Sequence, residues 1–475
     1  MGKRDRSHAP RKAFWLPVLL VLLLLGGAAA AYFTGATDRW SAEEPPDPVT
    51  EPAAVPPPEG MDIAAVPDPE PVAEAAGVGG LSTSAVRRTL AAGLADRDLG
   101  RSVHAAVGGL GEAGATYATG TGGFIPASTM KLATAVAALS ALGPDHRFDT
   151  TVVAQGRRLT LVGGGDPFLA RTPSAEWPDA ADVQTLAART VAEVGRRKPV
   201  RLSYDASLFS GPAENPFWRA DYIPDGIVSP IAALWVDEGI AADRSERVAD
   251  PAADAAAAFA AALAQRGVRV QGAPIPAAAP EAARTIATVS SPPLSQIAEQ
   301  VILISDNEGA EVLAHHVGLA VLDDGSFAGG AAGVRQTLAG LGVPLRGAVI
   351  RDGSGLSRQN RIRADTLLEV LRVAAEQPDL RPVLTGLPVG GFTGSLTFRF
   401  DQAPRAGVGR VRAKTGSLGG VRSLAGIATD QAGTPMVFVL AADRIRERNT
   451  VDAEQDLDNL AGALGACRCS RGAPR

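Results

Sequence analysis

An acidic, proline-rich segment over residues 34–78 limits what this chain can fold into, because it separates a short N-terminal part from everything that follows. Prolines and carboxylates are concentrated in it, as at 43–48 and 56–59. Proline stiffens the backbone and removes a hydrogen-bond donor, and like charges oppose collapse. We therefore predict a disordered, extended linker over 34–78, with the folded part of the chain after it.

The N-terminal part has the charge pattern of an exported protein. Five basic residues lie within 1–12, and an uncharged apolar run of 21 residues follows over 13–33. This run is long enough to span a bilayer, and positive charge before it keeps the N-terminus in the cytoplasm. We predict a cytoplasmic basic tail over 1–12 and a transmembrane signal-anchor over 13–33. Small residues at 28–31 leave a cleavable signal as the alternative. In either case the functional part lies outside the cytoplasmic membrane.

The overall composition is that of a globular protein with more than one domain. The chain has 475 residues, of which 46% are hydrophobic, and its net charge is −5. This charge balance provides no basic surface for nucleic acid, which we exclude as a partner. Cys467 and Cys469 are the only cysteines and lie close to the C-terminus. We expect no disulfide framework and an unstructured tail over 466–475.

Hydrophobic periodicity and turn signals divide the folded part into a catalytic domain and an insertion. Helices are predicted at 81–94, 127–142 and 452–464, and strands at 101–107, 115–118, 410–415, 422–429 and 435–442. Residues 155–290 mix helix and strand signals and are too many for a loop. We predict an inserted domain there, between catalytic segments at 79–154 and 291–465.

Lysine is scarce, and two of the lysines lie in short motifs that suggest chemistry. The chain contains five, of which Lys131 closes Ser-x-x-Lys and Lys414 opens Lys-Thr-Gly. Arginine remains protonated, whereas a buried lysine can lose its proton and act as a base. On a helix Ser128 and Lys131 share one face, so the lysine amine could accept the serine proton and make Ser128 a nucleophile.

The Lys-Thr-Gly motif and a third motif, at 305–307, support this interpretation. Ser305 and Asn307 are predicted to lie in a tight turn between two helices, and Lys414 to Gly416 to end a strand. A hydroxyl, an amide and a cation held in one cleft could relay a proton and bind an amide and a carboxylate. His315 and His316 lie near two glutamates, but no third ligand is in sight, so we predict neither a metal nor a cofactor.

This trio of motifs resembles the active-site signature of penicillin-recognising serine enzymes. Segments 127–131, 142–148, 163–167 and 351–358 narrow the resemblance to D-alanyl-D-alanine carboxypeptidase/endopeptidases of the penicillin-binding protein 4 type. The resemblance implies a multi-domain α+β fold of the serine DD-peptidase/β-lactamase kind. Its parts would be an antiparallel sheet flanked by helices, a helical subdomain and the inserted domain.

By the same resemblance the enzyme forms an acyl-enzyme on peptidoglycan stem peptides that end in D-Ala-D-Ala, and β-lactam antibiotics inhibit it. The implied catalytic residues are Ser128, Lys131, Ser305, Asn307 and Lys414. The implied substrate-binding residues are Thr415, Gly416 and Ser417, with Asp205, Gly355, Leu356, Arg358 and Leu418 as a pocket for a substrate side chain.

Two other functions remain open at this point. A β-lactamase or esterase on the same fold would share the first covalent step, and only rapid deacylation would distinguish it. A catalytically silent peptidoglycan-binding protein would need none of the motif side chains, so the intact motifs oppose it.

Overall fold

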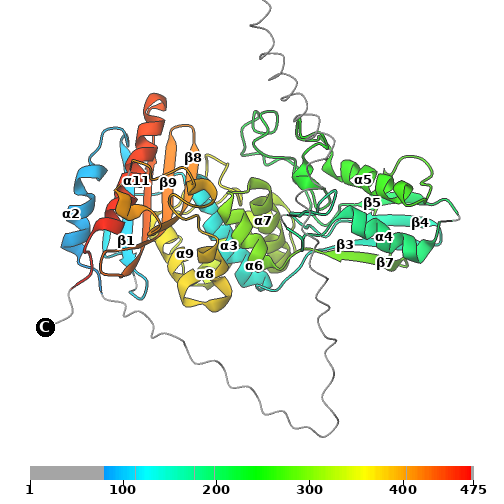
Figure 1. Cartoon of the computed structure of the whole chain (residues 1–475), viewed down its shortest axis with the longest axis horizontal. Helices are drawn as coiled ribbons and strands as arrows, with labels where there is room; N and C mark the ends of the chain where they lie inside the picture. Colours follow the sequence, from blue (N-terminus) through cyan, green and yellow to red (C-terminus); the bar gives the residue numbers. More distant parts are fainter. Residues whose placement is uncertain (1–79, 113, 176, 197, 403, 472–475) are drawn as a thin grey trace, which may run out of the picture. The chain divides into compact units, whose positions relative to one another are not determined.

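A computed structural model describes residues 80–471, apart from positions 113, 176, 197 and 403 (Figure 1). The basic tail at 1–12, the apolar run at 13–33 and the linker at 34–78 all lie outside the described residues. Within the described part, none of the helices has the length and apolarity needed to cross a membrane.

The first sheet has five antiparallel strands in the order β2-β1-β10-β9-β8 (Figure 1). The predicted N-terminal hairpin and the three C-terminal strands are confirmed. The strand that contains Lys414 continues to Leu418, beyond Gly416, where we predicted that it ends. The strands are β1 (Ser102–Gly109), β2 (Tyr117–Thr119), β8 (Val411–Leu418), β9 (Val421–Thr429) and β10 (Pro435–Asp443).

Helices cover both faces of this sheet. Successive side chains of a strand point to opposite faces, and almost all of β10 is buried on both. Phe438 and Leu440 pack with α2 (Thr83–Leu94) and α11 (Thr450–Ala466). Val437 and Val439 pack on the other face, against the helical part of the molecule.

That helical part is built around α3 (Met130–Leu142). Ten of its residues are buried, because alanine and leucine make it apolar on every side. Glycines let its neighbours approach closely: a Cβ added at Gly318 would lie 2.3 Å from the carbonyl oxygen of Asp324. The surrounding helices are α6 (Leu294–Leu303), α7 (Asn307–Leu322), α8 (Phe327–Gly340), α9 (Ala364–Glu376) and α10 (Pro382–Thr385).

The second sheet, in the order β6-β5-β4-β3-β7, lies largely within residues 155–290, where we predicted an inserted domain. Its strand β3 begins at Asp149, ahead of that predicted boundary, and pairs with β4 and β7. The parallel pair β4–β5 requires a crossover, which α4 supplies. The elements of this part of the chain are β3 (Asp149–Gln155), β4 (Arg158–Val162), α4 (Val183–Val194), β5 (Arg201–Asp205), α5 (Pro251–Gln265), β6 (Ile275–Pro276) and β7 (Arg284–Ser290).

The C-terminal segment is packed against the body, which corrects the prediction of an unstructured tail. Cys467 and Cys469 form a disulfide with each other, and Cys469 is fully buried. The Asp430 carboxylate accepts hydrogen bonds from the backbone N–H of Cys469 at 3.0 Å and of Ser470 at 3.1 Å. The carbonyl of Cys469 accepts one from Ser82 at 2.7 Å. The predicted tail is therefore ordered at least through Arg471.

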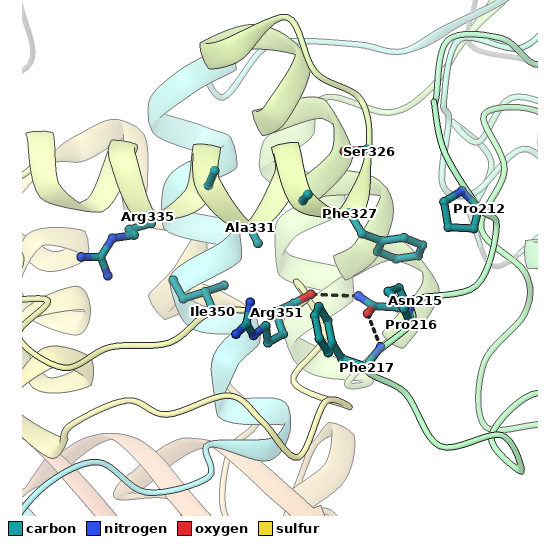
Figure 2. A pocket seen from close by; sticks show the side chains of 12 residues that line it. Pro212, Asn215, Pro216, Phe217, Ser326, Phe327, Ala331, Arg335, Ile350 and Arg351 are labelled. Carbon is teal, nitrogen blue, oxygen red and sulfur yellow. Dashed lines mark hydrogen bonds between the residues drawn. The ribbon is translucent and has the colours of Figure 1, made fainter.

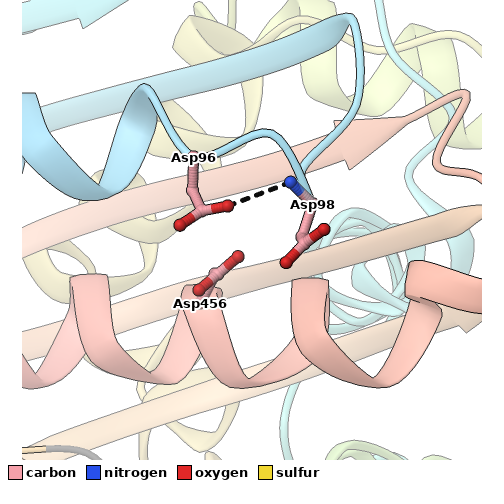
Figure 3. Close-up of side chains that lie close together, drawn as sticks. All are labelled: Asp96, Asp98 and Asp456. Atoms are coloured by element: carbon pink, nitrogen blue, oxygen red, sulfur yellow. Dashed lines mark hydrogen bonds between the residues drawn. The ribbon is translucent and has the colours of Figure 1, made fainter.

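Three carboxylates meet where the loop after α2 faces α11 (Figure 3). One oxygen each of Asp96, Asp98 and Asp456 lies within 4.8 Å of the others. Burial raises the pKa of Asp456 to about 6, and repulsion from the other two adds to the increase. This cluster therefore opposes folding when Asp456 is ionised.

Candidate active site

The Ser-x-x-Lys motif lies at the start of the central helix. Ala127–Thr129 form a 3₁₀ turn that leads into α3, where the sequence predicted one continuous helix. This turn places Nζ of Lys131 2.9 Å from Oγ of Ser128. Lys131 is fully buried, whereas Ser128 faces a cleft. The two motif side chains are thus in contact, with the hydroxyl toward solvent and the amine behind it.

The surroundings of Lys131 bring its pKa close to the working pH. Its Nζ also lies 2.8 Å from Oδ1 of Asn307 and 2.9 Å from the carbonyl oxygen of Ser354. Burial lowers the pKa of Lys131 to about 8, against the opposing effect of nearby carboxylates, with Asp306 foremost. A group with a pKa near the working pH serves best as a general base.

Ser305 and Lys414 form a second hydroxyl–lysine pair. Nζ of Lys414 lies 2.7 Å from Oγ of Ser305 and 3.0 Å from the carbonyl oxygen of Thr415. Burial holds the pKa of Lys414 well below its usual value, and the charge of Lys131 lowers it further. Ser305 occupies the predicted turn between α6 and α7 with a φ of 64°, a left-handed conformation.

Gly416 allows β8 to lie against the turn that carries the nucleophile. A Cβ at this position would lie 2.1 Å from Oγ of Ser423 and 2.6 Å from the carbonyl oxygen of Pro126. Next to it, Oγ1 of Thr415 is 3.0 Å from Oγ of Ser395, a contact for which the sequence offered no motif. Close approach of two backbones thus explains the glycine of Lys-Thr-Gly.

These motifs surround one cleft of about 450 Å³. Each of the three contributes to its lining: Ser128, Ser305 and Asn307, and Thr415 and Ser417. The amide Nδ2 of Asn307 donates to the carbonyl of Ile227 at 2.8 Å, which ties the cleft to the loop that follows β5. Such an arrangement can activate a serine hydroxyl and hold an anionic group beside it.

The predicted side-chain pocket is only partly formed as expected. Leu356, Arg358 and Leu418 line the cleft. Gly355 does not: its φ is +88°, and a Cβ there would lie 1.8 Å from the carbonyl oxygen of Ala127. Gly355 therefore supports the nucleophile turn from behind.

Asp205, which we expected in this pocket, does not line the cleft. It ends β5 in the second sheet, where its carboxylate accepts a hydrogen bond from the backbone N–H of Ala279 at 2.7 Å. The cleft is lined instead by two other carboxylates, Asp221 and Asp225, and Asp221 forms an ion pair with Arg219 at 2.6 Å. All three lie in a loop without a recognisable motif, so sequence reasoning missed them.

Glu311 is a further residue whose role sequence reasoning missed. Its buried carboxylate accepts hydrogen bonds from the backbone N–H of Gly353 at 3.1 Å and of Ser354 at 2.7 Å. It therefore positions the carbonyl of Ser354 that Lys131 contacts. His315 lies 2.8 Å from the backbone oxygen of Glu311, and burial lowers its pKa to about 4.

A separate cavity of about 420 Å³ opens between α8 and the loop at 212–217, and none of the motif residues lines it (Figure 2). The side-chain amide of Asn215 donates to the carbonyl of Arg351 at 2.8 Å, and the Arg351 guanidinium stacks over Phe217 at 4.6 Å (Figure 2). Asp352, which follows Arg351, accepts from the backbone N–H of Gly355 at 3.0 Å. This cavity is therefore lined in part by the loop at 351–355, which supports the turn that carries Ser128.

Comparison with known proteins identifies the family. A sequence profile of the D-Ala-D-Ala carboxypeptidase 3 (S13) family matches residues 86–246 and 241–464. The chain belongs to this family. A carboxypeptidase of Mycobacterium tuberculosis is 37% identical over 367 residues, which cover 73% of this chain and 76% of that protein. The predicted resemblance is thus confirmed.

A second sequence relative and a solved structure are also similar to this chain. A D-alanyl-D-alanine carboxypeptidase of an Actinomadura species is 30% identical over 64% of this chain and 70% of its own length. The crystal structure of penicillin-binding protein 4 from Haemophilus influenzae matches with a TM-score of 0.63 at 23% identity. The match covers 80% of this chain and 99% of that one. The predicted fold is confirmed.

Proposed function

We propose that this protein is a serine D-alanyl-D-alanine carboxypeptidase that trims peptidoglycan stem peptides through an acyl-enzyme on Ser128. The observation that carries the proposal is the 2.9 Å contact between Ser128 Oγ and a fully buried lysine amine whose pKa is lowered to about 8. Membership of the carboxypeptidase family supports the same activity.

In the first step the free amine of Lys131 takes the proton of Ser128, and Oγ attacks the carbonyl carbon between the two D-alanines. The tetrahedral intermediate carries a negative oxygen. Backbone N–H groups of Ser128 and Ser417 are suited to hold it, because both residues line the cleft. Donors of this kind are each worth roughly 3–4 kcal/mol in the transition state.

Collapse of the intermediate requires a proton for the departing D-alanine amine. Ser305 can relay it, since its hydroxyl is 2.7 Å from the Lys414 amine and lines the same cleft. Thr415 and Lys414 would hold the terminal carboxylate, and Asn307 the substrate amide. Water then hydrolyses the ester, with the same lysine as base.

We propose endopeptidase activity as well, as the resemblance to carboxypeptidase/endopeptidases of the penicillin-binding protein 4 type implies. β-Lactams would acylate Ser128 in the same way, as expected for a relative of penicillin-binding protein 4. Among the described residues that line the cleft, Asp221 and Asp225 are the only carboxylates, and neither belongs to a motif. We therefore place the carboxypeptidase ahead of a β-lactamase.

We further propose that residues 13–33 anchor the protein in the cytoplasmic membrane with its catalytic part on the cell-wall side. Fractionation of cells that make the full chain tests the anchor. Protein recovered only in the soluble exported fraction, with a new N-terminus near residue 31, would favour the cleaved signal.

Mass spectrometry after incubation with benzylpenicillin tests the central proposal, with Ser128→Ala as control. We expect a persistent adduct on Ser128 and D-alanine release from a pentapeptide, both absent in the variant. Fast drug turnover with a fleeting adduct would point to a β-lactamase. Absence of adduct and of turnover would favour a silent binding protein.

A further inference from the structure

A second polar pocket of about 550 Å³ adjoins the active-site cleft, and Arg358 and Gly419 line both. Its walls come from the start of β1, the loop at 120–125 before the nucleophile, the turn between β8 and β9, and the end of β10. We call it the arginine pocket, because four arginines line it: Arg101, Arg358, Arg361 and Arg444.

The pocket carries a strong positive charge. Among the described residues, none of the four guanidinium groups forms a salt bridge. Asp443 is its one acidic lining residue, and this side chain is enclosed, with Oδ2 accepting a hydrogen bond from the backbone N–H of Ile125 at 3.1 Å. Burial lowers the pKa of His104, which disfavours the charged form of this lining residue.

Two of the arginines are held in place and two are free. Nη1 of Arg358 donates to the carbonyl of Gly419 at 2.8 Å, and Nη1 of Arg361 donates to the carbonyl of Arg358 at 2.8 Å. Arg101 and Arg444 are exposed at the rim, and neither side chain hydrogen bonds to another described residue. Planar guanidinium groups with free donors match carboxylates well.

The course of β8 relates this pocket to the substrate. β8 is an edge strand, and its outer side is paired with the segment at 388–390 up to Ala413, whose N–H donates to the carbonyl of Pro388 at 2.9 Å. Beyond Ala413, no other described backbone group pairs with that side. A peptide adds to such an edge by backbone pairing. We consider a substrate peptide that pairs antiparallel to β8, with its terminal carboxylate at Thr415 and its scissile carbonyl at Ser417. The part of the peptide on the N-terminal side of the scissile bond, its acyl half, then runs toward Gly419, where the arginine pocket begins.

We propose that the arginine pocket is an anion-binding subsite that takes a carboxylate from the acyl half of the peptide substrate, upstream of the scissile bond. This inference rests on the proposed function, because it takes its direction from the expected position of the substrate in the cleft. It adds a specificity determinant at the far end of the cleft, which shares Arg358 with the predicted side-chain pocket and extends beyond it to Arg101 and Arg444.

The test compares two synthetic peptides that end in D-Ala-D-Ala and differ only in one upstream group, a free carboxylate or its carboxamide. The variant is Arg101→Gln/Arg444→Gln. Its matched control, Arg87→Gln/Arg88→Gln, removes the same charge from exposed positions of α2. Steady-state kcat/KM is measured for both peptides with the full-length protein.

We expect the pocket variant to lose about tenfold in kcat/KM on the carboxylate peptide, mostly through KM, because two charge-assisted contacts are lost. On the carboxamide peptide it should remain within about twofold of the parent protein, as should the control variant on both peptides. Higher ionic strength should reduce the parent protein's preference for the carboxylate.

Equal losses on both peptides, or no loss on either, would overturn the subsite. So would an equal loss in the α2 control, since the effect would then come from net charge. Failure of the parent protein to turn over either peptide or to form a benzylpenicillin adduct would overturn the proposed function, and the subsite with it.

Discussion

The lowered pKa of Lys131 makes a quantitative prediction about the pH dependence of acylation. With a pKa of about 8, the free amine makes up about 9% of the population at pH 7 and about 91% at pH 9. If the free amine is the base, the acylation rate constant should rise about tenfold over this range and then level off.

A substitution separates this effect from other titrations. Lys131→Arg keeps a positive charge beside Asp306 and Glu311 but cannot lose its proton. We expect acylation to fall by at least about a hundredfold, the lower end of what a general base contributes, and to lose its dependence on pH between 7 and 9. Protein folding is checked by the thermal unfolding midpoint, measured at both pH values.

Stopped-flow measurement of acylation by a chromogenic β-lactam, under single-turnover conditions, reports this step without product release. A rate that is flat from pH 7 to pH 9 in the parent protein would refute the assignment of Lys131 as base. So would an increase of the same size in Lys131→Arg, because the titrating group would then be another residue.

Three further predictions concern stability. Gly416→Ala places a Cβ 2.1 Å from a serine hydroxyl of β9 and should destabilise the fold by about 1–3 kcal/mol in urea unfolding, whereas Gly340→Ala, with open space, should not destabilise it. Asp456→Asn should raise the thermal midpoint at pH 7.5, because the pKa of Asp456 is raised to about 6 in the folded protein and its charge opposes folding above that pH; the gain should shrink as the pH falls below 6 and be nearly lost at the unfolded-state pKa of about 4, and a gain that persists undiminished at pH 4 would contradict this. Deletion of 467–475 leaves the Asp430 carboxylate without two donors and should cost about 1–3 kcal/mol, whereas deletion of 472–475 keeps both hydrogen bonds and serves as control.

The motif residues could be predicted because their chemistry depends on local spacing. One helical turn brings Lys131 to Ser128, and scarce lysines made the pair visible. Regular periodicity likewise revealed strands of the first sheet, four of which have eight or nine residues each. In contrast, the contact of Thr415 with Ser395 joins a strand to a loop that has no signature of its own.

The features that the sequence did not predict share a physical cause, because each depends on a contact with a residue distant in the chain. Glu311 resembled an ordinary helix carboxylate until the fold brought Ser354 against it. Asp205 was chosen from a segment where only the type of residue could be matched, and it proved to support the second sheet. The C-terminal segment is ordered because its backbone donates to the carboxylate of Asp430, a turn residue. The sequence alone does not show that Asp430 accepts these hydrogen bonds.

The pairing of β1 with β10 has a consequence for the order in which the molecule folds. Ser102 pairs with Asp443, so the first sheet cannot close until almost the whole chain has been synthesised. At roughly 5–20 residues per second, β1 waits roughly 20–70 s for its partner. During that interval Ser128 and Lys131 already exist, but β8 and Lys414 have yet to emerge from the ribosome or have no sheet to join. The nascent chain therefore carries a nucleophile without the rest of its active site, and hydrolytic activity begins only when the last strands are in place.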